Sequence, residues 1–381
     1  MALEELCPPS AAAPENALRQ TLLASSLLLA IAGCGDDDGD TSTVDATVPD
    51  DASAPADFGP GPMCSLPAMP TVDCMPLPTD YSPGADDMWA PCISDDGTYH
   101  RIEESISSIA RIRAFEDIAS LIFDPSGSPT SDDYLMARML YQEDEGLDSR
   151  VARRYDPRFE VPDGTDCTQP AMAAEYPDYC VGPVTLQPTI LDALNEGIEN
   201  GGVLPAARAE AALIWFLYAS TRKEAFSCTT AAKDCDSSYA YYTGGEVDRG
   251  GIGIARYIDE ADAAAHDRVW DALLAVRCWR DLDPDETATD LEMRDLARDQ
   301  LDRAISYGLA QVVRSRLMAM CEGDGLEALY HWTFVRTLAP ALYPTLGTGR
   351  STIEAAIAVD DPDSVDTDAF AQAIDDAYEC P

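Results

Sequence analysis

Basic residues are scarce in this sequence. Lysine and arginine together number 25 against 69 aspartates and glutamates, which gives a formal net charge of −44 at pH 7. Only two of the basic residues are lysines, Lys223 and Lys233, and none lies between Arg19 and Arg101. A field of this sign repels phosphate backbones and anionic lipid surfaces, and it attracts cations. The composition therefore argues against nucleic acid as a partner.

The sequence also lacks an apolar run long enough to span a bilayer near its start. The apolar run Thr21–Ala32 has 12 residues, whereas a helix needs about 20 apolar residues to cross the hydrocarbon core. A short apolar segment that ends in small residues is typical of a cleaved secretory signal. We therefore expect export, with no transmembrane helix formed by this run.

The residues that close this run, Ile31-Ala32-Gly33-Cys34, resemble the lipobox of bacterial lipoproteins. The resemblance implies that the preceding peptide is removed and that Cys34 is lipidated, which would attach the protein to a membrane through its lipid alone. Gly35, in place of an aspartate, implies transport to the outer membrane. An ordinary secretory signal with a chance cysteine is the alternative interpretation.

Composition divides the chain into four parts. Residues 1–33 form the predicted signal peptide, in which residues 1–17 are an artefact of the assigned start if translation begins at Leu18. Residues 34–62 are rich in aspartate and proline and hold no basic residue, so we expect a disordered tether. Residues 63–98, rich in proline and cysteine, are predicted to form an extended strap on a helical domain over 99–381.

CxxC pairs are absent and the cysteine spacings match no zinc pattern, so a zinc site is not expected. An even number of cysteines remains after Cys7 and Cys34 are set aside, which favours disulfides in an exported chain. Short separations predict the pairs Cys167–Cys180 and Cys228–Cys235, and a Cys278–Cys321 bridge would join two long helices. The partners of the other four stay open: Cys64, Cys74, Cys92 and Cys380.

Patterns typical of β-strands are nearly absent, whereas apolar residues recur every three to four positions, which is typical of amphipathic helices. The sequence predicts an all-α, disulfide-stapled bundle of helical hairpins. A glycine pair, Gly201-Gly202, is predicted to turn one hairpin, and Cys228–Gly253 to form a long loop. The expected helices cover Tyr99–Ile122, Tyr134–Glu143, Thr189–Glu199, Pro205–Phe226, Ile254–Trp279, Asp283–Met320, Leu326–Leu338 and Thr367–Tyr378.

Histidine is rare, and each of the three histidines has a carboxylate one helical turn away. Helix-borne histidine and carboxylate groups that meet inside a bundle can bind a divalent transition metal such as Fe, Zn or Mn. Surface ion pairs are the simpler explanation of the same spacings. The pairs are His100 with Glu103, Asp262 with His266, and Glu327 with His331.

The stretch His100-Arg101-Ile102-Glu103 is similar to the HxxE motif of imelysin-like and EfeO-like proteins. These are exported all-helical proteins that handle iron or other metals. The resemblance implies a metal-linked binding role for the helical domain.

A second candidate site follows the apolar helix that ends near Phe226. Arg222 and Glu224 lie at the end of this helix, and Tyr241 and Tyr242 lie in the predicted loop, so the four side chains are candidates to line a pocket. The alternative is a helix end that simply turns to solvent. No serine or cysteine nucleophile stands at a recognisable spacing from a histidine.

The sequence thus favours an outer-membrane lipoprotein of the cell envelope with a helical binding domain, in its sharpest form a metal-linked one. A purely structural or protein-interaction lipoprotein is the first alternative, and a hydrolase of unknown type is the second. Whether the chain is an enzyme is left open, with binding favoured.

Overall fold

The computed structural model describes residues 64, 66, 76–84, 88–143 and 146–378, and the structural statements below concern these residues. Within them the chain forms thirteen α-helices and no β-strand, which confirms the predicted all-α fold. No helix in this part of the chain is long and apolar enough to cross a membrane. The predicted signal peptide, Cys34 and the tether over 34–62 lie outside the described residues, as do Cys74 and Cys380.

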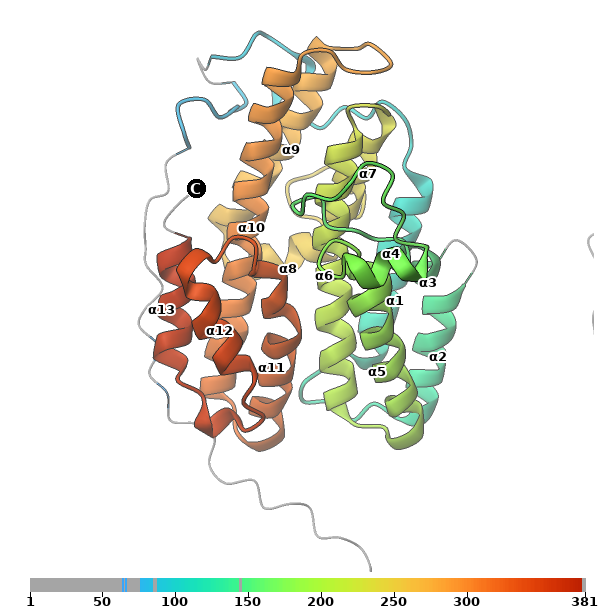
Figure 1. Ribbon diagram of the computed structural model, residues 1–381, viewed down its shortest axis with the longest axis vertical. Helices are drawn as coiled ribbons and strands as arrows, with labels where there is room; N and C mark the ends of the chain where they lie inside the picture. Colours follow the sequence, from blue (N-terminus) through green and yellow to red (C-terminus); the bar gives the residue numbers. More distant parts are fainter. Residues whose placement is uncertain (1–63, 65, 67–75, 85–87, 144–145, 379–381) are drawn as a thin grey trace, which may run out of the picture. The chain divides into compact units, whose positions relative to one another are not determined.

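Four helices form the first half of the bundle (Figure 1): α1 (Ile106–Ile122), α2 (Ser131–Gln142), α5 (Gln187–Asn200) and α6 (Val203–Ser227). α2 packs against α1 and α5, and α5 packs against α6. α2 begins with a capping box, in which the Thr130 hydroxyl accepts from the Asp133 N–H and the Asp133 carboxylate accepts from the Thr130 N–H at 2.8 Å. α1 begins at residue 106 and not near the predicted residue 99.

Two glycines turn the chain between α5 and α6, as predicted. Gly201 and Gly202 have φ angles of 65° and 86°, in the left-handed region that glycine adopts without a steric penalty. Further along this hairpin, Gly197 of α5 lies directly against the ring of Tyr134 on α2. The hairpin therefore depends on glycine both at its turn and at its contact with α2.

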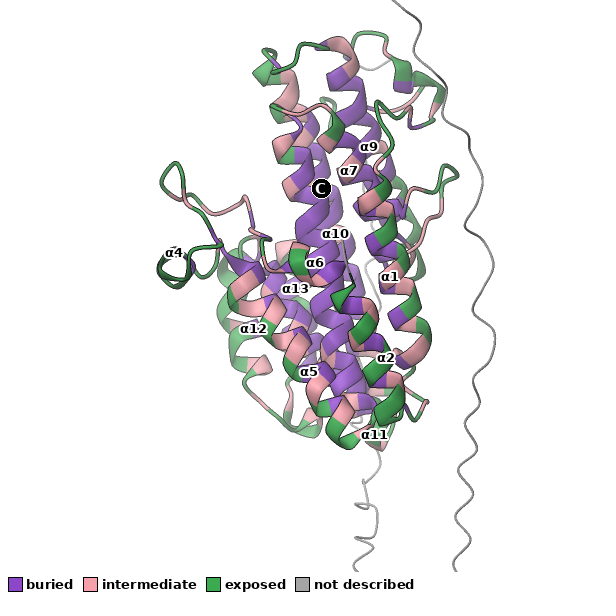
Figure 2. Ribbon diagram, turned by 90° about the vertical axis from the view of Figure 1, so that its right-hand side faces the viewer, coloured by how far each residue is buried: buried purple, intermediate pink, exposed green. Residues whose placement is uncertain are grey.

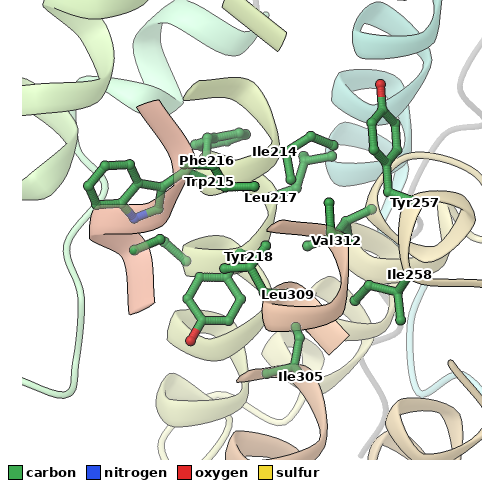
Figure 3. Packing of buried hydrophobic residues seen from close by; sticks show 14 of the residues in the cluster. Ile214, Trp215, Phe216, Leu217, Tyr218, Tyr257, Ile258, Ile305, Leu309 and Val312 are labelled. Atoms are coloured by element: carbon green, nitrogen blue, oxygen red, sulfur yellow. The ribbon is translucent and has the colours of Figure 1, made fainter. Parts of the chain in front are cut away.

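α6 is the most buried helix of this half because its sequence is apolar on nearly every side. Buried residues continue along both α6 and α10 (Leu291–Glu322), which lie in the interior of the bundle (Figure 2). Leu217 of α6 belongs to the same buried cluster as Leu309 and Val312 of α10 (Figure 3). The core of the domain therefore runs between these two helices.

The second half of the bundle is built around α10. This helix packs against α9 (Ala263–Leu282), α8 (Ile254–Ala261) and α11 (Gly325–Leu338). The chain ends with α12 (Arg350–Ile357) and α13 (Thr367–Ala377), which pack against each other. Short helical turns connect these elements: η1 (Ile93–Asp96), α3 (Leu147–Val151), α4 (Pro170–Glu175), η2 (Gly182–Leu186), η3 (Ala339–Leu342), η4 (Gly347–Gly349) and η5 (Pro362–Ser364).

Besides the start of α1, three predictions about helices and loops are wrong. The predicted loop Cys228–Gly253 contains α7 (Lys233–Thr243), which packs on α6. The predicted helix Ile254–Trp279 is broken at Asp262, whose carboxylate accepts from the backbone N–H groups of residues 264 and 265 and so starts α9. The segment at Asp283 does not start a helix, because its carboxylate accepts from Thr289 and Asp290 N–H groups at 2.6 and 2.7 Å and folds it into a loop ahead of α10.

Four disulfides staple the described residues. The predicted pairs Cys167–Cys180 and Cys228–Cys235 are confirmed. The predicted Cys278–Cys321 bridge is wrong, because Cys278 of α9 bonds to Cys92 and Cys321 of α10 bonds to Cys64. Both bridges reach back to the segment of residues 64–98, which we call the strap.

Candidate ligand-binding cleft

A cleft of about 370 Å³ opens between two walls and a floor. The first wall comes from residues 155–181, which we call the disulfide lobe. The second wall comes from the C-terminal end of α11, η3 and the start of α12, and the floor from η2, α5 and α6. The lining residues are Asp156, Arg158, Phe159, Pro177, Asp178, Val181, Thr185, Leu186, Thr189, Ala212, Trp215, Arg336, Thr337, Pro340, Tyr343, Pro344 and Arg350.

The disulfide lobe is held in shape at its base. Cys167–Cys180 closes it, the rings of Tyr155 and Tyr179 stack with centroids 4.8 Å apart, and the Asp156 N–H donates to the Tyr179 carbonyl at 2.8 Å. Because the two ends of the lobe are tied together, its wall of the cleft is a fixed surface.

Arg158 connects this wall to the opposite one. Its Nη2 donates to the carbonyl of Ala341 in η3 at 2.9 Å, and its Nε donates to Asp156 Oδ1 at 2.9 Å. Its Nη1 donates to the Tyr218 hydroxyl at 3.1 Å. Burial alone would raise the pKa of Asp156, but the Arg158 guanidinium outweighs burial and lowers it. Arg158 is therefore fully engaged and sets the spacing of the walls.

Two further arginines, on the second wall, keep free donors. Arg350 Nε donates to Glu354 at 2.6 Å, and its two Nη groups have no hydrogen-bond partner within the described residues. Arg336 donates from Nε to the Ile357 carbonyl at 2.9 Å and pairs through Nη1 with Asp360 at 2.8 Å, which leaves Nη2 without a partner in the same part of the chain. Both guanidiniums can thus donate to a ligand.

Aromatic rings complete the cleft. The Arg350 guanidinium lies 4.6 Å from the centroid of the Tyr343 ring. On the floor, Trp215 points away from the cluster that contains Leu217 and Val312 (Figure 3). Its side chain is buried, and its indole N–H has no acceptor in the described structure. An indole N–H only donates, so Trp215 is one more unused donor at the floor of the cleft.

The four side chains that the sequence suggested for a pocket lie in the core and not in this cleft. Arg222 pairs with Asp302 at 2.8 Å, and Glu224 pairs with Arg154 at 3.0 Å. Tyr241 accepts from Arg111, and Tyr242 shares a hydrogen bond with His266.

The first predicted metal pair does not form a contact. His100 Nε2 lies 2.9 Å from Asp96 Oδ2 in a half-exposed ion pair. Glu103 is exposed, and its backbone N–H donates to Asp236 at 2.6 Å. The local fold thus uses both residues in the segment that leads into α1.

The second pair is also separated by other contacts. Asp262 caps α9 and accepts from the Tyr307 hydroxyl at 3.2 Å, whereas His266 Nδ1 lies 3.0 Å from the Tyr242 hydroxyl. Burial is the main cause that lowers the pKa of His266. The ring is therefore held as a neutral partner of a buried tyrosine.

The third histidine lies in a buried cluster around Glu210. His331 Nδ1 lies 3.3 Å from Arg316 Nη1, and Arg316 donates to Glu210 at 2.6 Å. Burial, followed by the Arg316 charge, lowers the pKa of His331 to about 4. Glu327, its predicted partner, is exposed. Among the described residues no three metal-ligating side chains form a group, so the structure does not gather the six predicted ligands into one site.

Compared with the models of known protein families, with curated proteins and with solved structures, the chain matches none of them. The residues of the cleft are therefore the basis for inferring what it binds. The sequence did not identify Arg336, Arg350 and Asp178 as cleft residues, because they do not form a motif with a recognisable spacing along the chain. The sequence carries no signal for Trp215 either; only its indole N–H, which has no acceptor among the described residues, distinguishes it from a packing residue.

Proposed function

We propose that this chain is an envelope lipoprotein whose helical domain binds a small carboxylate-bearing molecule in the cleft between the disulfide lobe and η3. The single observation that carries this proposal is the presence of Arg336 and Arg350 on one wall, both with free guanidinium donors. A guanidinium presents paired N–H donors that match the two oxygens of a carboxylate.

The surrounding charge makes these arginines informative. In a chain with 69 acidic and 25 basic residues, most of the surface repels anions. Three arginines line one cleft, which concentrates guanidinium donors at one place on this surface. The volume of about 370 Å³ also falls in the range of small-molecule sites.

The lining favours recognition over nucleophilic catalysis. Among the described residues that line the cleft, there is no serine, cysteine, histidine or lysine. The polar side chains are arginines, aspartates, threonines, Tyr343 and Trp215, which bind and orient a ligand through hydrogen bonds. A binding role therefore accounts for this site better than the hydrolase alternative.

The envelope location is supported by the lipobox resemblance at Ile31-Ala32-Gly33-Cys34. Cys34→Ala in the producing bacterium is expected to abolish palmitate labelling and to release the protein from membranes, because the lipidation implied by the lipobox resemblance takes place on Cys34. Unchanged membrane retention of the Cys34→Ala protein would refute the anchor.

The cleft is tested by calorimetric titration of the full chain in detergent with phenylacetate and, as a neutral comparison, phenylacetamide. Phenylacetate is expected to bind more tightly, and Arg350→Ala is expected to weaken it about tenfold or more, since a hydrogen bond to a charged group contributes about 1.5–3 kcal/mol.

Arg249→Ala is the matched control for this titration. Arg249 is similarly exposed, pairs with Asp267 at 3.0 Å and lies 6.0 Å from the Trp270 ring, but it does not line the cleft. Equal losses in the two variants, or equal binding of the acid and the amide, would contradict a carboxylate site in the cleft.

A further inference from the structure

The two walls of the cleft carry opposite charges at their rims. Asp178 lines the cleft from the disulfide lobe, and Arg350 lines it from the start of α12. The pKa of Arg350 is raised, chiefly by its hydrogen bond with Glu354, and the Asp178 carboxylate adds to the rise. The two groups therefore interact electrostatically although they belong to different walls.

Asp178 has no assigned role in holding the fold. It is exposed, and it makes no hydrogen bond or ion pair within the described residues. By contrast, Asp156 on the same wall is buried and accepts hydrogen bonds from Arg158. Asp178 is thus the carboxylate at the cleft that remains available to a cation.

Apolar groups also line the cleft. Phe159 and Pro177 come from the lobe, Leu186 and Trp215 from the floor, and Pro340 from the second wall. A ligand that contacts both Asp178 and Arg350 can therefore place an apolar side chain against these groups.

We propose that the cleft binds a zwitterion of the amino-acid class with an apolar side chain. Its carboxylate would lie at Arg336 and Arg350, and its ammonium group at Asp178. This inference rests on the proposed function, because it keeps the carboxylate contact and adds a cationic group on the opposite wall.

Net charge favours a zwitterion over a simple anion. The chain carries a formal charge of −44, so an anion approaching the cleft is repelled before it reaches the arginines. A simple cation is attracted to the acidic surface everywhere and gains little from this cleft in particular. A molecule with no net charge and both groups approaches without that repulsion and meets both rims.

The test is a calorimetric comparison of L-leucine and L-phenylalanine with their N-acetyl derivatives, using the full chain in detergent. Acetylation removes the ammonium charge and keeps the carboxylate and the side chain. We expect at least one amino acid to bind about tenfold more tightly than its N-acetyl derivative. Asp178→Asn is expected to abolish this preference and to leave the affinity for the N-acetyl acid within about twofold.

Glu175→Gln is the matched control, because it removes one exposed carboxylate from the same lobe at a residue that does not line the cleft. It is expected to keep the tenfold preference. N-acetyl acids that bind as well as amino acids, with Arg350→Ala weakening both, would overturn the zwitterion and leave the carboxylate site intact. Failure of both classes to bind, together with phenylacetate, would overturn the proposed function itself.

Discussion

Tyr81 and Gln300 exchange two hydrogen bonds across the interface between the strap and α10. The Tyr81 N–H donates to Gln300 Oε1 at 2.9 Å, and Gln300 Nε2 donates to the Tyr81 carbonyl at 2.9 Å. The amide side chain thus pairs with the strap backbone as a neighbouring strand would. Because both residues are buried, no water replaces these bonds.

Gln300→Ala is expected to lower the free energy of unfolding by about 1–3 kcal/mol, because it removes both hydrogen bonds between the Gln300 amide and the buried Tyr81 backbone. Urea denaturation of the full chain measures the change, and hydrogen exchange should show faster exchange at the Tyr81 amide. Gln372→Ala is the control, since Gln372 is exposed on α13 and bonds only to Asp376 among the described residues. A Gln300→Ala protein as stable as this control would contradict the role of the pair.

Peptide mapping of the non-reduced protein is expected to recover Cys64 linked to Cys321 and Cys92 linked to Cys278. The double variant Cys92→Ala/Cys278→Ala should unfold at a lower urea concentration, with a loss of about 2–4 kcal/mol, because the bridge no longer restricts the unfolded chain. Recovery of a Cys278–Cys321 peptide would contradict these two bridges and support the pairing expected from the sequence.

Gly197→Ala is expected to destabilise the protein even though alanine favours helices. A Cβ at this position would lie 2.2 Å from Cδ1 of Tyr134, which is fully buried. Overpacking of this kind costs about 1–3 kcal/mol. Thermal and urea denaturation measure it, with Glu199→Ala on the exposed side of α5 as the comparison. Equal stability of the two variants would show that α2 moves away at no cost.

His331 is expected to make the protein less stable in mild acid. Its pKa is about 4 in the folded state and about 6.5 in an unfolded chain. As pH falls through this window the unfolded state binds a proton that the folded state does not, so stability is lost by up to about 1.4 kcal/mol per pH unit.

His331→Asn should flatten this dependence between pH 6.5 and 4, because the asparagine oxygen can accept from Arg316 and does not titrate. Urea midpoints across the window measure the slope. His266, whose pKa is also lowered by burial, keeps part of the slope in the variant. Parallel curves for the variant and the wild type would show that His331 is protonated equally in both states.

Local patterns in the sequence were sufficient to predict several helices. The Gly201-Gly202 turn and the apolar pattern of α6 act within a few residues, so they could be predicted. α7 was missed because the glycines after it and the nearby cysteines suggested a loop. Its tyrosines are buried against the core, and packing on α6 stabilises a helix there.

The cleft depends on relationships that no local pattern contains. Arg158, Trp215 and Arg350 come from three distant parts of the chain and meet only because α6 packs on both α5 and α11. Each histidine has a carboxylate one helical turn away in the sequence, but the rings of His266 and His331 contact Tyr242 and Arg316 from other elements instead. Spacing along a helix predicts proximity, and tertiary packing selects the partner.

The strap disulfides also determine how the domain would respond to force. A pull on the chain ahead of Cys64 passes through the bond to Cys321 directly into α10, and a second covalent link at Cys92 passes it into α9. The strap therefore cannot be peeled away one hydrogen bond at a time while these bonds are oxidised. Under reduction the same load falls on weak contacts such as the Tyr81–Gln300 pair, so the mechanical strength of the attachment follows the redox state of its surroundings.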